Sequence, residues 1–354
     1  MKYDLTQARK CIETLDKRRF DRALLGSGDA FRHIVSLLPL LLHLNHSALP
    51  GYVEDAPVGI SDFILSNYQQ GFLSKEHPEL AASVQSAVNS DAVCAPILGI
   101  YVMGSFGSIS QTSASDLDIW ICHQDDLSEQ DQQRLAEKTK KITQWASTFH
   151  VEMHFYLMTQ KRFRNERYSD PLTKENSGSA QYMLLLEEFY RSAVRLAGKP
   201  LLWLHLWVED EKQYEAEVAR LVAEGELNPN DWVDFGGLGQ FSASEYFGAS
   251  LWQLYKGIDS PYKSVMKILL LETYAQEYPN AHLIARQFKE DLQIALIEGK
   301  ATGRTVVKTI DNMINGDKSQ DIGDAEKRSL IEIKEAIVRV QTAPAMDIIA
   351  KENL

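Results

Sequence analysis

Between Pro96 and Trp207 the sequence alternates short apolar runs with longer stretches of helical periodicity, and this alternation constrains the fold more than any other feature. The expected strands cover residues 97–103, 117–122, 151–158 and 201–207, and the expected helices cover 129–148 and 179–197. Short strands separated by helical segments are typical of a mixed sheet covered by helices. This part of the chain is therefore predicted to be a mixed α and β unit.

Helical periodicity dominates on both sides of this unit. Residues 5–45 are expected to form an N-terminal helical segment, and the turn-rich stretch 50–96 a connection with one or two short helices. Beyond Trp207 the expected helices cover 210–224, 243–257, 261–277 and 280–297. We therefore expect an α+β fold with a small mixed sheet, an N-terminal helical segment and a following helical domain.

The charge balance limits the classes of partner. The chain has 49 acidic and 37 basic side chains, which gives a net charge of −12 at pH 7. Proteins that hold duplex nucleic acid by neutralising its phosphates are basic. The composition therefore argues against duplex nucleic acid as a partner, although it leaves room for a local basic pocket.

Cysteine usage and hydropathy indicate the compartment. Cys11, Cys94 and Cys122 form no CxxC pair and have no metal-ligand spacing, so we expect reduced thiols. The most apolar stretch, Ile34 to Leu44, is far shorter than the roughly 20 residues of a membrane-spanning helix. With no apolar signal segment at the N-terminus, the sequence predicts a cytoplasmic protein without a transmembrane segment.

The polar residues that indicate chemistry follow the first expected strand. Gly104 and Ser105 come where that strand ends and a helix would begin, and free N–H groups at a helix N-terminus bind phosphate. Ser113 lies in the serine-rich turn that follows and is a further candidate for phosphate contact, although such serines usually bond their own backbone. Asp116 and Asp118 are two residues apart in the next strand, so both carboxylates face one side of the sheet.

Two carboxylates on one face repel each other unless cations lie between them, and hard oxygen ligands favour Mg²⁺ or Mn²⁺. Glu152 is the best candidate for a third ligand, because it lies between apolar Val151 and Met153 in the next expected strand. Two ions roughly 3.5–4 Å apart would then stabilise the attacking and leaving oxygens of an in-line phosphoryl displacement. We therefore expect two metal ions held by Asp116, Asp118 and Glu152.

The order of these features is typical of polymerase-beta-like nucleotidyltransferases, whose palm is a small mixed sheet with helices. Longer strings resemble one family in particular, the class I (enterobacterial-type) adenylate cyclases. The strings are residues 104–111, 115–120, 187–191, 234–238, 245–256 and 258–263. The resemblance covers roughly residues 5–290 and is not recognisable beyond about residue 298. The C-terminal regulatory half of the family is expected to be absent from this chain.

The resemblance implies an adenylate cyclase. Members of this family convert ATP to 3′,5′-cyclic AMP and pyrophosphate when the ribose 3′-hydroxyl attacks the α-phosphorus. Asp116 and Asp118 would hold the metal ions, and Glu152 would help to hold the ion that acidifies the 3′-hydroxyl or would accept its proton.

A second group of candidate residues follows Pro261. Lys263 and Lys267 are four residues apart, so they share one face of the expected helix and could contact the triphosphate. Tyr262 could cover the base or bond a phosphate. In related nucleotidyltransferases a helical domain closes the cleft with a lysine and a tyrosine.

These expectations divide the chain into four parts. They are an N-terminal helical segment (1–90), a nucleotidyltransferase catalytic domain (91–208), a helical nucleotide-closing domain (209–298) and a tail of uncertain origin (299–354). All 33 aromatic residues lie at or before Phe288, and the only regular element expected in the tail is an amphipathic helix over 325–341. We assign the tail no chemistry.

Several alternatives stay open. Lys263 and Lys267 could be solvated helix residues. His150 and His154 flank Glu152 and would suit zinc, although no cysteine or third histidine converges with them in the sequence. The core motif also fits a nucleotidyltransferase that uses a separate acceptor, or an inactive nucleotide-binding regulatory module.

Overall fold

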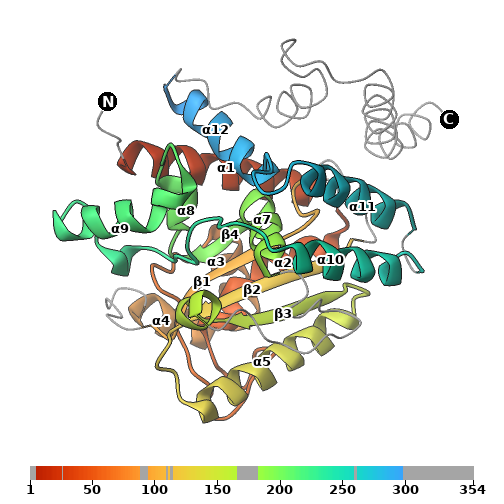
Figure 1. The fold of residues 1–354 in the computed structure, drawn as a ribbon. Coiled ribbons are helices and arrows are strands. Elements are labelled where there is room, and N and C mark those ends of the chain that lie inside the picture. Colours follow the sequence, from red (N-terminus) through yellow and green to blue (C-terminus); the bar gives the residue numbers. More distant parts are fainter. Residues whose placement is uncertain are drawn as a thin grey trace, which may run out of the picture.

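The computed structural model describes residues 5–25, 27–87, 95–108, 111, 115–165, 182–258 and 261–297. Within these ranges the chain forms one four-stranded sheet surrounded by helices, as Figure 1 shows. The strands are β1 (Ile97–Met103), β2 (Leu117–His123), β3 (Met153–Met158) and β4 (Val194–Gly198), in the spatial order β3-β2-β1-β4. Strand β1 is antiparallel to both β2 and β4, and β2 is parallel to β3. The expected α+β class with a small mixed sheet is confirmed.

Three of the four expected strands are confirmed, and the fourth is wrong. Residues 202–205 form the short helix α8 (Leu202–His205), because Trp203 stacks on Tyr190 with ring centroids 4.3 Å apart and takes the segment out of the sheet. The true fourth strand, β4, occupies the end of the predicted helix 179–197, of which only α7 (Tyr182–Ser192) is helical. Pairing with β1 fixes these five residues as a strand, against their local helical pattern.

Helices cover most of the remaining described chain. The N-terminal and connecting helices are α1 (Leu5–Leu25), α2 (Asp29–His43), α3 (Asn67–Glu76) and α4 (Pro78–Ala87). Helix α5 (Glu129–Ser147) lies between β2 and β3 in the sequence, and the short helix α6 (Gln160–Asn165) follows β3. The later elements are η2 (Glu211–Gln213), α9 (Tyr214–Ala223), η3 (Pro229–Asp231), α10 (Ala243–Lys256), α11 (Pro261–Gln276) and α12 (Ile284–Ile297). The expected helices are thus confirmed to within a few residues, apart from 179–197, while the helix expected over 325–341 lies outside the described residues.

The sheet separates two hydrophobic cores. One face carries an aliphatic core to which α2, α5 and the β2 residues Leu117, Ile119 and Ile121 contribute. The other face carries a core rich in aromatic rings, where Trp120 of β2 stacks on Phe189 of α7 with centroids 4.1 Å apart. This aromatic core continues into α10, α11 and α12, so it crosses the predicted domain boundary at residues 208 and 209. Among the described helices, none combines the length and apolar character needed to cross a membrane.

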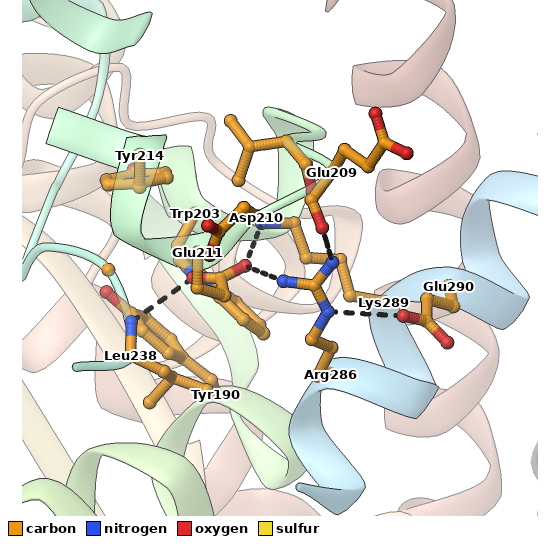
Figure 2. Close-up of polar contacts among 12 residues, drawn as sticks. Tyr190, Trp203, Glu209, Asp210, Glu211, Tyr214, Leu238, Arg286, Lys289 and Glu290 are labelled. Atoms are coloured by element: carbon orange, nitrogen blue, oxygen red, sulfur yellow. Dashed lines mark hydrogen bonds and ion pairs between the residues drawn. The ribbon is translucent and has the colours of Figure 1, made fainter. Parts of the chain in front are cut away.

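Charged side chains anchor α12 to the aromatic side, and Figure 2 shows their polar contacts. The Glu211 carboxylate accepts hydrogen bonds from Trp203 Nε1 (2.9 Å) and from the Leu238 amide (3.3 Å). Two cations of α12 lie beside it, with Lys289 Nζ at 3.3 Å and Arg286 Nη1 at 3.5 Å. Lys289 is fully buried, and this burial lowers its pKa to about 8 although Glu211 opposes the shift. Glu211 therefore offsets part of the cost of burying the Lys289 charge.

Candidate active site

The two aspartates lie at the start of β2, as predicted. Asp116 precedes the strand and Asp118 is its second residue, so strand alternation directs both side chains to the face that carries Trp120. Asp118 is partly exposed, and Tyr156 of the neighbouring strand donates its hydroxyl hydrogen to Asp118 Oδ1 over 3.4 Å. Both carboxylates are therefore accessible at the edge of the sheet where β1 ends and β2 begins. The strand neighbours Leu117 and Ile119 enter the aliphatic core.

Gly104 lies directly across from this edge. Met103 pairs with Asp118 in the antiparallel register, and a Cβ atom built on Gly104 would lie 4.0 Å from Asp118 Oδ2. The expected helix does not begin here, because residues 104–107 form turns with φ of +87° at Gly104 and +66° at Gly107. Ser105 lies in this turn, where its carbonyl oxygen accepts from Ser108 Oγ at 2.7 Å. Ser113 lies outside the described residues.

Glu152 reaches the edge in the expected register but faces solvent. Its carbonyl oxygen accepts from the Leu117 amide (3.0 Å), and parallel pairing of β2 with β3 gives Glu152 the same face as Asp116 and Asp118. The side chain is 73% exposed, and its Oε1 lies 3.2 Å from His154 Nε2. Within the described ranges, no three histidine, cysteine, aspartate or glutamate side chains gather closely enough to hold a metal ion. The role of Glu152 as third ligand stays a prediction.

The zinc alternative needs His150, Glu152 and His154 to alternate along one strand. The strand begins only at Met153, and His150 lies in a turn after α5 with φ of +60°. His150 therefore does not share a strand face with the other two residues.

The helix that carries the expected lysines forms as predicted. Tyr262 and Lys263 lie in the first turn of α11, but their side chains lie outside the described residues. Lys267 is described, and its Nζ donates to both carboxylate oxygens of Glu188, at 2.8 and 3.0 Å. In this conformation Lys267 ties α11 to α7, so its expected contact with phosphate stays a prediction.

Helix α7 makes contacts around the candidate site that the sequence did not predict. The Gly104 amide donates to Ser192 Oγ (3.0 Å), which fixes the turn beside Asp118 to the end of α7. Buried Glu187 accepts from Tyr274 of α11 (3.1 Å) and from the Ala285 amide of α12 (3.0 Å). The signal for Glu187 and Glu188 was present, since two acids interrupt an apolar helical run, whereas nothing in the sequence distinguished Ser192.

Comparison with known proteins identifies the class of this chain. The model described as the adenylate cyclase NT domain matches residues 4–204, and the model of the class I adenylate cyclase second domain matches residues 241–304. The chain therefore belongs to the class I adenylate cyclase family, and the resemblance noted in the sequence is confirmed.

Individual relatives agree with this assignment. An adenylate cyclase of Haemophilus influenzae is 67% identical over 297 residues, which is 82% of this chain and 35% of that protein. An adenylate cyclase of Pasteurella multocida is 63% identical over 294 residues, with the same two coverages. An adenylate cyclase of Escherichia coli K12 is 46% identical over 282 residues, or 79% of this chain and 33% of that protein. The chain thus spans about a third of the length of these relatives. No solved structure matches it.

Proposed function

We propose that this chain carries the catalytic region of an adenylate cyclase, which converts ATP to 3′,5′-cyclic AMP and pyrophosphate on a polymerase-beta-like nucleotidyltransferase palm. One observation carries the proposal. In this chain, which belongs to the class I family, the Asp118 carboxylate lies beside the backbone of Gly104, at the edge where β1 ends and β2 begins. Carboxylates and a glycine turn at one edge suit a metal-bound triphosphate.

The donor set at this edge fits magnesium or manganese. Mg²⁺ is usually bound by one or two carboxylates together with substrate phosphates and water, so Asp116 and Asp118 suffice as protein ligands for a nucleotide-bound ion. Glu152 shares their face and is the proposed ligand for a second ion. When bound, the ions would offset the charge of the phosphates and make the ribose 3′-hydroxyl more acidic.

The protein residues have separate roles in this proposal. The turn at Gly104 and Ser105 would let the triphosphate approach the backbone, with Ser113 nearby in sequence. Lys263 and Tyr262 at the start of α11 would contact the nucleotide from the opposite side, and Lys267 would join them after leaving Glu188. Positive charge near the β and γ phosphates would favour release of pyrophosphate as the 3′-oxygen bonds to the α-phosphorus.

Product analysis tests this function. The purified chain is incubated with ATP and Mg²⁺, and the nucleotides are separated by chromatography. Equal amounts of cyclic AMP and pyrophosphate are expected. Nucleotide transfer that appears only with an added acceptor would identify a nucleotidyltransferase instead, and ATP binding without turnover would identify a regulatory module. The cytoplasmic location is a further proposal, consistent with the buried free thiol of Cys122.

A further inference from the structure

The turn beside Asp118 rests directly on the N-terminal helix α1. Gly107 has φ of +66°, and a Cβ atom built on it would lie 2.4 Å from the carbonyl oxygen of Arg19. That distance is shorter than any real carbon contact, so only glycine permits this approach. The backbones of the turn and of α1 are therefore in close contact.

Gln111 joins the turn at Gly107 to the end of α1. Its Oε1 accepts from the Gly107 amide at 2.7 Å, while its Nε2 donates to the Ala23 carbonyl and to Ser27 Oγ, each at 3.1 Å. The last carbonyls of a helix have no partner within the helix, and the Ala23 carbonyl accepts from both Ser27 Oγ (2.6 Å) and Gln111 Nε2. One amide side chain thus links the turn to the helix end.

Arg19 links α1 to the end of α7, which in turn contacts Gly104. Its guanidinium donates to the carbonyls of Ser192 (2.6 Å) and Ala193 (3.0 Å) where α7 ends, a position at which a cation is favoured. Ser192 Oγ in turn accepts from the Gly104 amide. Phe106, buried within the turn, packs against Phe20 of α1 with ring centroids 6.1 Å apart.

We propose that Gln111 and Arg19 are positioning residues that hold the turn 104–108 against α1, so that helix α1 fixes Gly104 beside Asp118. The inference rests on the proposed function, because it concerns the same phosphate-binding turn. Neither residue needs to touch the nucleotide. A displacement of about 1 Å at a site of phosphoryl transfer can lower the rate by about a hundredfold, so a small shift of this turn matters.

The test compares Gln111→Leu with Gln69→Leu. Gln69 is a matched control because it is 3% exposed, accepts from the Ser66 amide (3.0 Å) and donates to the Ser36 carbonyl (2.9 Å), between α2 and α3. Both substitutions remove an amide that bonds backbone on two sides. At a temperature where both variants are folded, kcat/KM for ATP should fall about tenfold or more in Gln111→Leu and stay within about twofold of wild type in Gln69→Leu.

A readout independent of turnover accompanies the kinetics. Hydrogen exchange at the amides of Gly104 and Gly107 should accelerate in Gln111→Leu and stay unchanged in Gln69→Leu. Equal kinetics in the two variants, with an active wild type, would overturn the inference and leave the proposed function intact. If the wild type forms no cyclic AMP, the proposed function fails, and unchanged exchange would overturn the positioning role separately.

Ser27→Ala provides a milder variant if Gln111→Leu does not fold. It removes one of the two acceptors of Gln111 Nε2 and the bond from Ser27 Oγ to the Ala23 carbonyl, and it keeps the bonds of Gln111 to Gly107 and Ala23. A smaller loss of kcat/KM, with faster exchange at Gly107, is expected. Wild-type kinetics and wild-type exchange in Ser27→Ala would then contradict the proposal.

Discussion

The same strands contribute different residues to the two faces of the sheet. On the aliphatic face β2 contributes Leu117 and Ile119 to a core of branched side chains, and buried Lys138 donates to the Leu44 carbonyl just after α2. On the aromatic face the same strand contributes Trp120 and carries Asp118 at its exposed end. The buried cation Lys289 on this face is paired with the Glu211 carboxylate. Strand alternation thus lets a single seven-residue strand contribute to a core on one face and, in the proposed function, carry a metal ligand on the other, so substitutions at adjacent positions should fail in different ways.

The largest effect should come from the charged edge. Asp118→Asn is expected to lower cyclic AMP formation roughly a thousandfold, because a neutral amide cannot replace an anionic group facing the triphosphate and its metal ions. Thermal unfolding should not be impaired, since the side chain is only partly buried. Asp126→Asn, the same substitution in the exposed turn after β2, should retain wild-type activity. Near-normal turnover in Asp118→Asn would remove this residue from the site.

The neighbouring position should show the opposite behaviour. Ile119 is fully buried in the aliphatic core, so Ile119→Ala is expected to lower the free energy of unfolding by about 2–5 kcal/mol through lost contacts and a cavity. Activity per folded molecule should change little. Urea unfolding measures the first quantity and an assay corrected for folded fraction the second. If Ile119→Ala lost activity without losing stability, the aliphatic face would not serve packing alone, and the comparison of the two faces would be contradicted.

Buried charge on the aromatic face should contribute less than a core isoleucine. Glu187 accepts from Tyr274, Ala285 and Arg191, so Glu187→Gln weakens three charge-assisted bonds but keeps an acceptor oxygen. A loss of about 1.5–3 kcal/mol is expected in urea unfolding. Glu137→Gln, which breaks an exposed pair with Lys141 on the other side of the molecule, should change the free energy of unfolding very little.

The last prediction uses pH to separate two buried groups, Asp16 of α1 and His43 of α2. Burial raises the pKa of Asp16 to about 7, although Arg195 and Arg19 oppose the shift. Its stabilisation is therefore present near pH 4 and is lost as the pH rises to 7. Burial lowers the pKa of His43 to about 4, so its stabilisation is present above pH 6.5 and is lost as the pH falls.

The two slopes oppose each other between pH 4 and 6.5, and single variants should separate them. Asp16→Asn should make stability rise more steeply with pH, because only the His43 contribution remains. His43→Gln should shift the slope in the other direction. Urea unfolding at pH 5 and pH 7.5 measures both, and identical slopes in the two variants would show that neither group is titrating in this range.

Local pattern predicted those elements whose residues interact mainly with their own neighbours. Strand β1 has the predicted bounds, and the alternation that pairs Asp116 with Asp118 needed only the strand period. Strand β4 and helix α8 could not be predicted, because pairing with β1 and stacking on Tyr190 decide those short segments. Geometry also overrode sequence at Gly104, whose positive φ gives a turn where a helix was expected.

Some residues of the candidate site could likewise be predicted from the sequence, and others could not. The residue types of Asp116, Asp118 and Glu152 carried a recognisable chemical pattern, and their common face followed from the alternation. Ser192 and Gln111 have ordinary side chains whose partners lie far away in sequence. Gln111 is 88 residues from Ala23, and no spacing within one element could reveal that contact.

The bond between Arg19 and the Ala193 carbonyl also has a consequence for synthesis, because 174 residues separate the partners. Ribosomes add about 5–20 residues per second, so the guanidinium waits about 9–35 s for its acceptor to be made. Throughout that interval α1 has no finished surface to dock on, and its apolar residues stay open to other contacts. Helix α1 is therefore secured only long after its own synthesis, and the turn beside Asp118 takes its final form only after α7 has emerged.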